Sequence, residues 1–346
     1  MTTPDGLEPL DALRRIAFLM ERGRKGTYRI KAFRNAADTV AGLSPQELAA
    51  AYEQGRLEDL PGIGSATALV IQQTLDGQTP DYLAKLEQES PEHLVDGGEE
   101  LRGALRGDCH CHSDWSDGGS PIQEMVATAI ELGHEYLVLT DHSPRLRVAN
   151  GLSVERLTQQ LGVIETINAH VSDFRLLPGI EVDILDDGSL DQTDAMLDRL
   201  AVRVASVHSK LAMDRAPMTR RMVAAVSNPR VNILGHCTGR LVEGDRGKRK
   251  QSTFDAQAVF QACLEHDTAV EINSRPERQD PPDELLTMAL EMGCLFSIDS
   301  DAHAPGQLDF QQYGCARAEA LGVPAERIID TWPVEELLAW ANRFGG

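Results

Sequence analysis

Apolar residues recur with a helical period through residues 7–89. In the first segment they stand three or four residues apart, at Leu10, Leu13, Ile16, Ala17 and Met20, which is the spacing of one buried helix face. Turn signals at Ser44-Pro45 and at Leu60-Pro61-Gly62-Ile63-Gly64 each open a further helical stretch. This pattern predicts a small all-α domain over residues 1–92.

The pattern changes after a polar, glycine-bearing stretch at residues 93–105, which we predict to be a linker. Over residues 106–346, short apolar runs alternate with amphipathic stretches of helical period. The apolar runs predict strands at 136–140, 176–183, 202–207, 231–235, 268–272 and 295–299. The amphipathic stretches predict helices near 121–132, 153–169, 217–226, 255–266, 283–292, 310–321 and 334–343. This alternation indicates an α/β fold with a parallel sheet, which we expect to close as a barrel.

Histidine and carboxylate residues stand at the ends of the predicted strands. In the segment 108–118, His110 and His112 are two residues apart and therefore project to the same side of a strand. The other positions of this kind are Asp141-His142, Glu181, His208, His236, Asp301 and His303. Because the carboxyl ends of parallel strands meet at one face of a barrel, we expect these side chains to share one pocket.

Each of these positions also has a plain structural interpretation. A lone histidine is more often a core or surface residue than a ligand, and Asp141-His142 could form a turn. The run Cys109–His112 could be a zinc tetrad, but a strand turns only the two histidines to one side. The joint pattern favours metal binding, because six of the ten histidines stand at strand ends, together with the carboxylates Asp117, Glu181, Asp301 and, as an open candidate, Asp108. Mixed imidazole and carboxylate ligands suit Zn, Mn or Fe, and a set of this size requires two or three ions.

Composition narrows the class of protein. The chain has 346 residues, 42% of them hydrophobic, and no apolar run approaches the roughly 20 residues of a membrane span. The first residues lack the apolar core of a secretory signal, and the six cysteines show no C-x-x-C pair and no disulfide-like spacing. We therefore expect a cytoplasmic protein with reduced cysteines, no disulfide partner and no membrane partner.

The net charge of −21 argues against nucleic-acid binding, but the distribution of the charge weakens that argument. Residues 12–35 carry eight basic side chains and a single acidic one, Glu21. Three divalent ions in the pocket would also return about six positive charges to residues 106–346. Charge alone therefore does not exclude a phosphate-bearing substrate.

The order of the motifs resembles the PHP family of phosphoesterases, named for polymerase and histidinol phosphatase members. The motifs are His110-x-His112 with Ser116-Asp117-Gly118, Thr140-Asp141-His142, Gly179-Ile180-Glu181-Val182-Asp183, Ser206-Val207-His208-Ser209, Gly235-His236 and Ser300-Asp301-Ala302-His303. The resemblance spans residues 106–346 and implies a distorted (β/α)7 barrel of the TIM type with three divalent metal ions. It implies that His110, His112, Glu181 and Asp301 hold one ion, that Glu181, His208 and His236 hold a second, and that Asp117, His142 and His303 hold a third.

The amino-terminal segment resembles the small helical domain of bacterial family X DNA polymerases. The PHP domains of these polymerases also carry the motifs most similar to those of residues 106–346. Leu60–Ala68 resembles a helix-hairpin-helix loop, and Tyr28–Ala37 resembles the segment upstream of that loop in the same polymerases. The resemblance implies a DNA-binding domain, because the N-terminus of a helix can bind a phosphate. Its candidate DNA contacts are Gly62, Gly64, Ser65, Lys31 and Arg34. A Pro-Gly turn between two helices is, however, also a common structural device.

Two departures from those polymerases limit the prediction. Residues 66–74 contain no lysine, so the lyase chemistry of some relatives is not supported. The helical domain is followed almost at once by the barrel, so no segment remains for a nucleotidyl-transfer palm between them. We therefore reject polymerase activity.

The predicted activity is hydrolysis of phosphate esters. The leading hypothesis is a DNA phosphodiesterase, either a 3′–5′ exonuclease or an end-processing enzyme, acting on DNA ends or single-stranded DNA. The alternative is a phosphomonoesterase of the histidinol-phosphatase type, acting on a small phosphorylated metabolite. A DNA-binding protein with a purely structural metal site is disfavoured, because every ligand position of the family is filled.

Basic side chains near the ligand motifs are candidates for binding phosphate. They are Arg145, Arg147, Lys210, Arg240 and Arg275. For catalysis itself we expect Asp301, Arg240 and Arg145 to act, with Asp301 moving protons. Surface ion pairing is the alternative for each basic residue, and the basic run 247–250 is expected to be an exposed loop.

Overall fold

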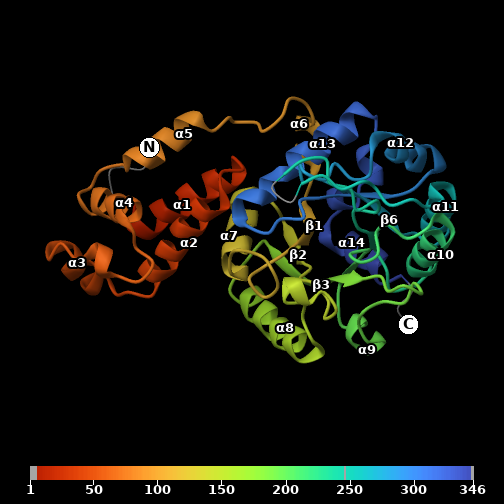
Figure 1. The fold of residues 1–346 in the computed structure, drawn as a ribbon, viewed down its shortest axis with the longest axis horizontal. Coiled ribbons are helices and arrows are strands. Elements are labelled where there is room, and N and C mark those ends of the chain that lie inside the picture. The colour runs from red at the N-terminus through yellow and green to blue at the C-terminus, as the bar shows by residue number, and fades with distance from the viewer. Residues whose placement is uncertain (1–5, 245–246, 344–346) are drawn as a thin grey trace. The chain divides into compact units, whose positions relative to one another are not determined.

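The computed structural model describes residues 6–244 and 247–343. It divides into two compact units, Met1–Glu92 and His93–Gly346, which Figure 1 colours from red to blue along the chain. Each unit has its own hydrophobic core, as expected of two domains.

The first unit is built from helices. They are α1 (Pro9–Arg22), α2 (Thr27–Ala41), α3 (Pro45–Glu53), the 3-10 helix η1 (Leu57–Asp59), α4 (Ser65–Leu75) and α5 (Asp81–Glu89). A capping box begins α3: the Ser44 hydroxyl accepts from the backbone N–H of Glu47, and the Glu47 carboxylate accepts from that of Ser44. The core contains the positions with helical spacing, such as Leu13 and Ile16. The predicted all-α domain is confirmed.

The turn between η1 and α4 packs against α2. Gly62 has a φ of +73°, which glycine adopts without a steric penalty. A side chain at this position would lie 3.5 Å from Asn35 of α2. The Thr39 hydroxyl donates to the carbonyl of Pro61 over 2.7 Å and ties the turn to the same helix. Gly62 itself and the start of α4 remain exposed.

A buried ion pair joins α1 to α2. Arg34 Nε lies 2.8 Å from one carboxylate oxygen of Glu21, and a second guanidinium nitrogen lies 2.7 Å from the other. Both side chains are buried, so each charge is compensated inside the core. This contradicts the expectation that Arg34 contacts DNA, because its guanidinium is directed at Glu21.

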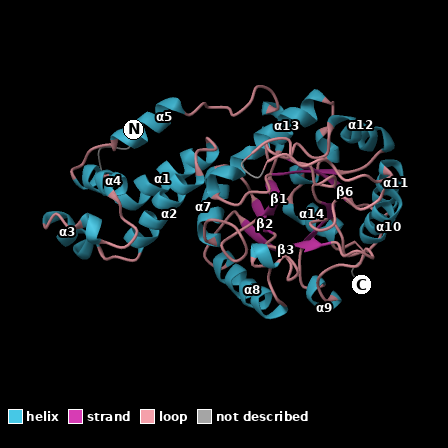
Figure 2. Cartoon of the chain, in the orientation of Figure 1, coloured by secondary structure: helices cyan, strands magenta, loops and turns pink. Residues whose placement is uncertain are grey.

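The second unit is a parallel barrel surrounded by helices (Figure 2). Its strands, in both sequence and spatial order, are β1 (Gly107–Cys111), β2 (Tyr136–Leu139), β3 (Arg175–Asp183), β4 (Val202–Ser206), β5 (Ile233–Leu234), β6 (Ala269–Asn273) and β7 (Phe296–Asp299). Its α-helices are α6 (Glu99–Ala104), α7 (Ile122–Glu131), α8 (Val154–Asn168), α9 (Asp194–Leu197), α10 (Arg215–Val226), α11 (Ala256–Glu265), α12 (Asp283–Met292), α13 (Gln311–Ala320) and α14 (Val334–Ala341). Its 3-10 helices are η2 (Arg147–Ala149), η3 (Pro305–Phe310), η4 (Ala325–Arg327) and η5 (Ile329–Thr331). The predicted seven-stranded TIM-like barrel is confirmed.

The stretch at residues 93–105, which we expected to be a linker, packs on the barrel. Leu101 and Leu105 belong to the core of the second unit. The backbone N–H of Gly98 donates to the Glu319 carboxylate over 2.8 Å, next to the contact between α6 and α13. The connection between the two units is therefore short.

Carboxylates help to join β1 to β7. The backbone N–H of Cys109 donates to Asp299 Oδ1 over 2.9 Å, and that of Ser300 donates to Asp108 over 3.3 Å. All four residues are buried. Asp108, which the sequence left open as a metal ligand, therefore has a structural partner in this seam.

The six cysteines are free thiols, and all are buried. Within residues 6–244 and 247–343, no helix has the length and apolar character needed to cross a membrane.

Candidate metal centre

The predicted ligands converge at the carboxyl ends of the strands. His110 lies in β1 and Glu181 in β3, and the other ligands come from the segments that follow the strands: His112, Asp117, His142, His208, His236, Asp301 and His303. His110 and His112 are fully buried, and Glu181 is 1% exposed. The structure thus brings all nine side chains to one place, as the motif order predicted.

Glu181 lies at the middle of the cluster. Its Oε1 lies 2.8 Å from His236 Nε2 and 3.1 Å from His208 Nε2. Its Oε2 lies 2.9 Å from His142 Nδ1 and 3.4 Å from His110 Nε2. One carboxylate therefore faces imidazoles on both of its oxygens, which is the placement expected of a ligand shared between two cations.

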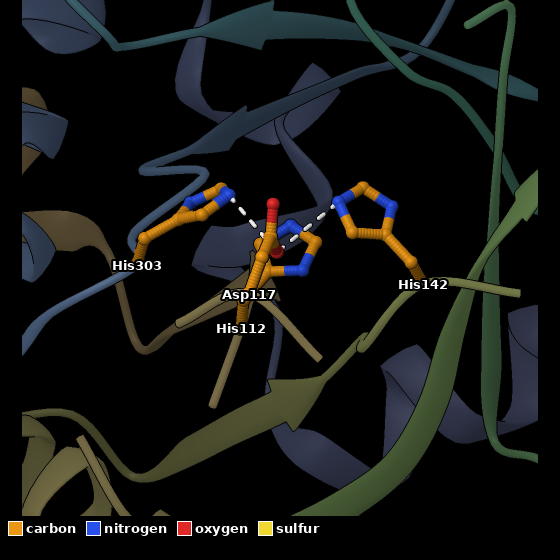
Figure 3. Close-up of side chains that lie close together, drawn as sticks. All are labelled: His112, Asp117, His142 and His303. Carbon is orange, nitrogen blue, oxygen red and sulfur yellow. Dashed lines mark ion pairs between the residues drawn. The ribbon is translucent and has the colours of Figure 1, made fainter. Parts of the chain in front are cut away.

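A second group consists of His112, Asp117, His142 and His303 (Figure 3). Asp117 Oδ1 lies 3.4 Å from His142 Nε2 and 3.4 Å from His303 Nε2. These three residues and His112 bring one ligand atom each to within 4.8 Å of one another. The same holds for His110, His112 and Asp301, and for His142, Glu181 and His208. His112 and His142 thus each belong to two groupings, where the family resemblance implied one ion for each.

The buried nitrogens of the cluster have lone pairs that no hydrogen bond uses. Within the described residues, His112 Nδ1, His236 Nδ1 and both ring nitrogens of His208 are buried without a hydrogen-bond partner. His142 Nδ1 also makes no hydrogen bond, although it lies 2.9 Å from Glu181. Buried polar atoms are normally paired. Imidazole and carboxylate groups that converge and leave several ring nitrogens unpaired fit divalent cations.

Burial and mutual charge set the protonation of the cluster. Burial alone would lower the pKa of His142, but Glu181 outweighs it and raises that pKa to about 10. Burial, and then the neighbouring imidazoles, lower the pKa of His112 to about 3. Burial would raise the pKa of Glu181, yet the surrounding histidines hold it well below its usual range. An ionised carboxylate and an unprotonated imidazole are the forms that bind metal, and Glu181 and His112 have these forms, whereas His142 has to lose a proton to bind a cation.

Carboxylates outside the predicted ligand set orient the histidines. His110 Nδ1 lies 2.6 Å from Glu271 Oε1, and His208 Nδ1 lies 3.5 Å from Asp183 Oδ1. A hydrogen bond such as the one at His110 fixes the ring orientation of a metal-binding histidine and raises its basicity. Asp183 stood in the Gly179–Asp183 motif, and neither Asp183 nor Glu271 was predicted to orient a ligand.

Asp301 is held by basic and amide groups. Arg278 Nε donates to its Oδ2 over 3.0 Å, and Asn273 Nδ2 donates to the same oxygen over 3.1 Å. Burial would raise the pKa of Asp301, but Arg278 and then His112 keep it well below the usual range. A carboxylate held in the ionised form suits a metal ligand. It does not suit the proton-moving role that the sequence suggested.

A cavity of about 230 Å³ opens beside the cluster. Two arginines, Arg249 and Arg278, line it together with most of the ligands. The described residues of its lining include none of the five basic residues predicted to bind phosphate. Sequence reasoning missed Arg278 entirely. It placed Arg249 in an exposed basic loop, and residues 247–250 are indeed exposed, with Arg249 bridging Leu241 in a short antiparallel pairing.

Four of the five predicted phosphate-binding residues are exposed or bind partners outside the metal centre. Arg145 and Arg147 are exposed, and Lys210 pairs with Asp186. Arg240 donates to two backbone carbonyls in the loop after β6. Arg275 is the exception in position: it lies 2.8 Å from His303 Nδ1. Arg240 and Arg145 are therefore not placed for the catalytic roles expected of them.

Two protein families match the chain. Residues 108–275 match the PHP domain, and residues 6–80 match the helix-hairpin-helix domain. The chain is a PHP-domain protein. Its amino-terminal unit is a helix-hairpin-helix domain, as the resemblance implied.

The relatives of this PHP-domain protein include a protein named as a DNA polymerase and exonuclease and others named as phosphatases. The DNA polymerase/3′-5′ exonuclease PolX of Bacillus subtilis is 36% identical over 241 residues, which are 70% of this chain and 42% of PolX. The chain thus spans about two fifths of that relative. The probable phosphatase YcdX of Escherichia coli is 25% identical over 244 residues, which cover 65% of this chain and 90% of YcdX. A crystal structure of histidinol phosphate phosphatase from Lactococcus lactis, complexed with zinc, L-histidinol and phosphate, is 16% identical with a TM-score of 0.43, over 63% of this chain and 92% of that one.

Proposed function

We propose that this PHP-domain protein is a metal-dependent phosphodiesterase that acts on DNA, as a 3′–5′ exonuclease or an end-processing enzyme. The observation that carries this proposal is the convergence of nine ligand side chains beside an arginine-lined cavity. The helix-hairpin-helix domain and the exonuclease named among the relatives support DNA as the substrate.

Three divalent ions, Zn, Mn or Fe, would be held as the family resemblance implies. His110, His112, Glu181 and Asp301 would hold one, Glu181, His208 and His236 a second, and Asp117, His142 and His303 a third. Bound metals of this kind supply Lewis acidity and activated water for phosphoester hydrolysis. The overlap of the observed groupings at His112 and His142 fits a centre in which neighbouring ions lie close together.

The protein's own contribution is to fix the phosphate and the ligands. Arg278 uses its Nε to hold Asp301, and it also lines the cavity, so its terminal nitrogens can bind a phosphate oxygen. Arg249 lines the same cavity and anchors its own Nε to the carbonyl of Gly239 over 2.7 Å. We assign phosphate binding to these two arginines, with Arg275 beside His303 as a third contributor.

DNA contact is assigned to the hairpin of the first unit. Gly62, Gly64 and Ser65 are exposed at the N-terminus of α4, where backbone N–H groups attract a phosphate. Lys31 is exposed on α2, one helical turn before the residue that the hairpin contacts. A phosphate backbone following this surface would therefore meet both a helix N-terminus and a cation.

The alternative is a phosphomonoesterase that acts on a small phosphorylated metabolite. The probable phosphatases among the relatives favour it, because this chain covers most of their length. The acidic net charge also favours a small substrate over a polyanion.

One experiment separates the two functions. The full chain is incubated with Mn²⁺ and either single-stranded DNA labelled at its 5′ end or histidinol phosphate. We expect stepwise shortening of the DNA from its 3′ end. Phosphate release from histidinol phosphate without DNA shortening would establish the alternative, and inactivity toward both would refute the proposal.

A further inference from the structure

The loop that follows β2 presents an apolar side chain to solvent at the metal centre. Val148 is 95% exposed, yet it lines the same cavity as the ligands. Leu146 and Leu211 line this cavity as well. The cavity therefore has a floor of ligands and arginines and an apolar wall at its mouth.

Hydrogen bonds and a close backbone approach hold the loop in the conformation that exposes Val148. The backbone N–H of Ala149 donates to the carbonyl of Leu146 over 3.0 Å, and Asn150 Nδ2 donates to the carbonyl of Trp115 over 3.1 Å. A side chain at Gly151 would come within 1.9 Å of the Ser143 carbonyl oxygen, so the loop closes too tightly for any other residue. Fixed apolar surface beside a polar reaction centre is a feature of ligand-binding sites.

The chemistry of the wall selects its occupant. A phosphodiester bound at the arginines carries an organic group on each side, and in DNA the group nearest the 3′ end is a nucleoside with a flat base. An aliphatic wall offers such a base dispersion contact and removal from water, as stacking surfaces do in proteins that bind single strands. The three wall side chains carry no hydrogen-bonding group, so they cannot read the edge of the base.

We infer that Leu146, Val148 and Leu211 form a subsite for the 3′-terminal nucleobase of a single-stranded DNA substrate, independent of base identity. This inference rests on the proposed DNA phosphodiesterase function and adds the part of the substrate that the enzyme recognises. It makes a nucleotide unit, and not phosphate alone, the group that positions the reacting bond.

The test compares two DNA ends on the same enzyme. Single strands ending either in thymidine or in an abasic tetrahydrofuran nucleotide are digested with Mn²⁺, and kcat/KM is measured for removal of the terminal unit. The parent protein is expected to prefer the thymidine end by about tenfold. Val148→Ser should reduce this preference to near one. Because Val148 is exposed, the substitution leaves the core intact.

Val154→Ser is the matched control, since Val154 is a partly exposed valine at the start of α8 and does not line the cavity. It should keep the parent preference. An equal rate at both ends in the parent, or an unchanged preference in Val148→Ser, would overturn the subsite while leaving the DNA phosphodiesterase in place. Failure of the parent to cut either strand would overturn both.

Discussion

The two units of the chain treat buried charge in opposite ways. In the helical unit, Glu21 and Arg34 neutralise each other through two hydrogen bonds inside the core. In the barrel, Glu181 is surrounded by imidazoles, and several buried ring nitrogens of the described residues bond to nothing. The first arrangement is complete as it stands. The cluster around Glu181 destabilises the barrel until a cation binds, because buried polar atoms without partners cost free energy.

The strongest test of this contrast removes a ligand that belongs to two groupings. His112→Ala is expected to lower kcat on single-stranded DNA by about 10³-fold, because two cation positions lose a donor. DNA affinity, measured by filter binding, should stay near the parent value, since the hairpin is untouched. His170→Ala, an exposed histidine of the same unit, is the control. Undiminished turnover in His112→Ala would remove the metal centre from the reaction.

Removing the metal should destabilise only one of the two units. At metal concentrations about a thousand times Kd, binding contributes about 4 kcal/mol, or about 10 °C in Tm for a unit of this size. Trp115, Trp332 and Trp340 all lie in the second unit, so tryptophan fluorescence reports on the barrel alone. Chelation should lower that transition and leave the helical unit unchanged. An unshifted fluorescence transition would contradict the contrast.

Breaking the internal ion pair should do the reverse. Arg34→Met removes the two hydrogen bonds that Arg34 makes to the buried carboxylate of Glu21 and should cost the helical unit about 3 kcal/mol. Circular dichroism should show early loss of helix, while the fluorescence transition of the barrel is retained. The double variant with Glu21→Leu should recover much of the loss, because the buried carboxylate is removed as well. A single variant as stable as the parent would show that the pair is dispensable.

A smaller effect is expected from a carboxylate that orients a ligand. Glu271→Gln keeps the size of the side chain near His110 but removes its charge, and should lower metal affinity or turnover by about 10- to 100-fold. A high concentration of Mn²⁺ should restore part of the activity if Glu271→Gln weakens metal binding. It would not do so if the substitution only disturbed the fold. Glu265→Gln, an exposed change at the end of α11, should have no effect.

The fold and the ligands could be predicted because their signals are local. Most strands are short apolar runs with a ligand at or just after the end, and the predicted strand at 202–207 differs from β4 by one residue. His110 and His112 needed only the two-residue period of a strand. Once the strands were placed, the topology of a parallel barrel brought the ligands together.

The arginines could not be assigned in the same way. Arg278 and Arg275 stand in one loop, and only the packed structure shows that the first holds Asp301 and lines the cavity. Arg34 lies in a basic segment, yet it pairs with the single acidic residue nearby. A guanidinium on a long flexible stem can reach in many directions, so its partner depends on contacts between elements and leaves no period in the sequence.

The seam between β1 and β7 also bears on how the protein is made. Asp330 joins its two sides: its carbonyl accepts from the backbone N–H of Arg106 over 2.7 Å, and its carboxylate accepts from that of Ile298 over 2.8 Å. His110 is synthesised long before Asp301, so the ligands of β1 cannot form the full cluster until Asp301 and His303 have been made. The nascent chain therefore gains the complete set of nine ligands only after β7 has been synthesised and has docked on β1.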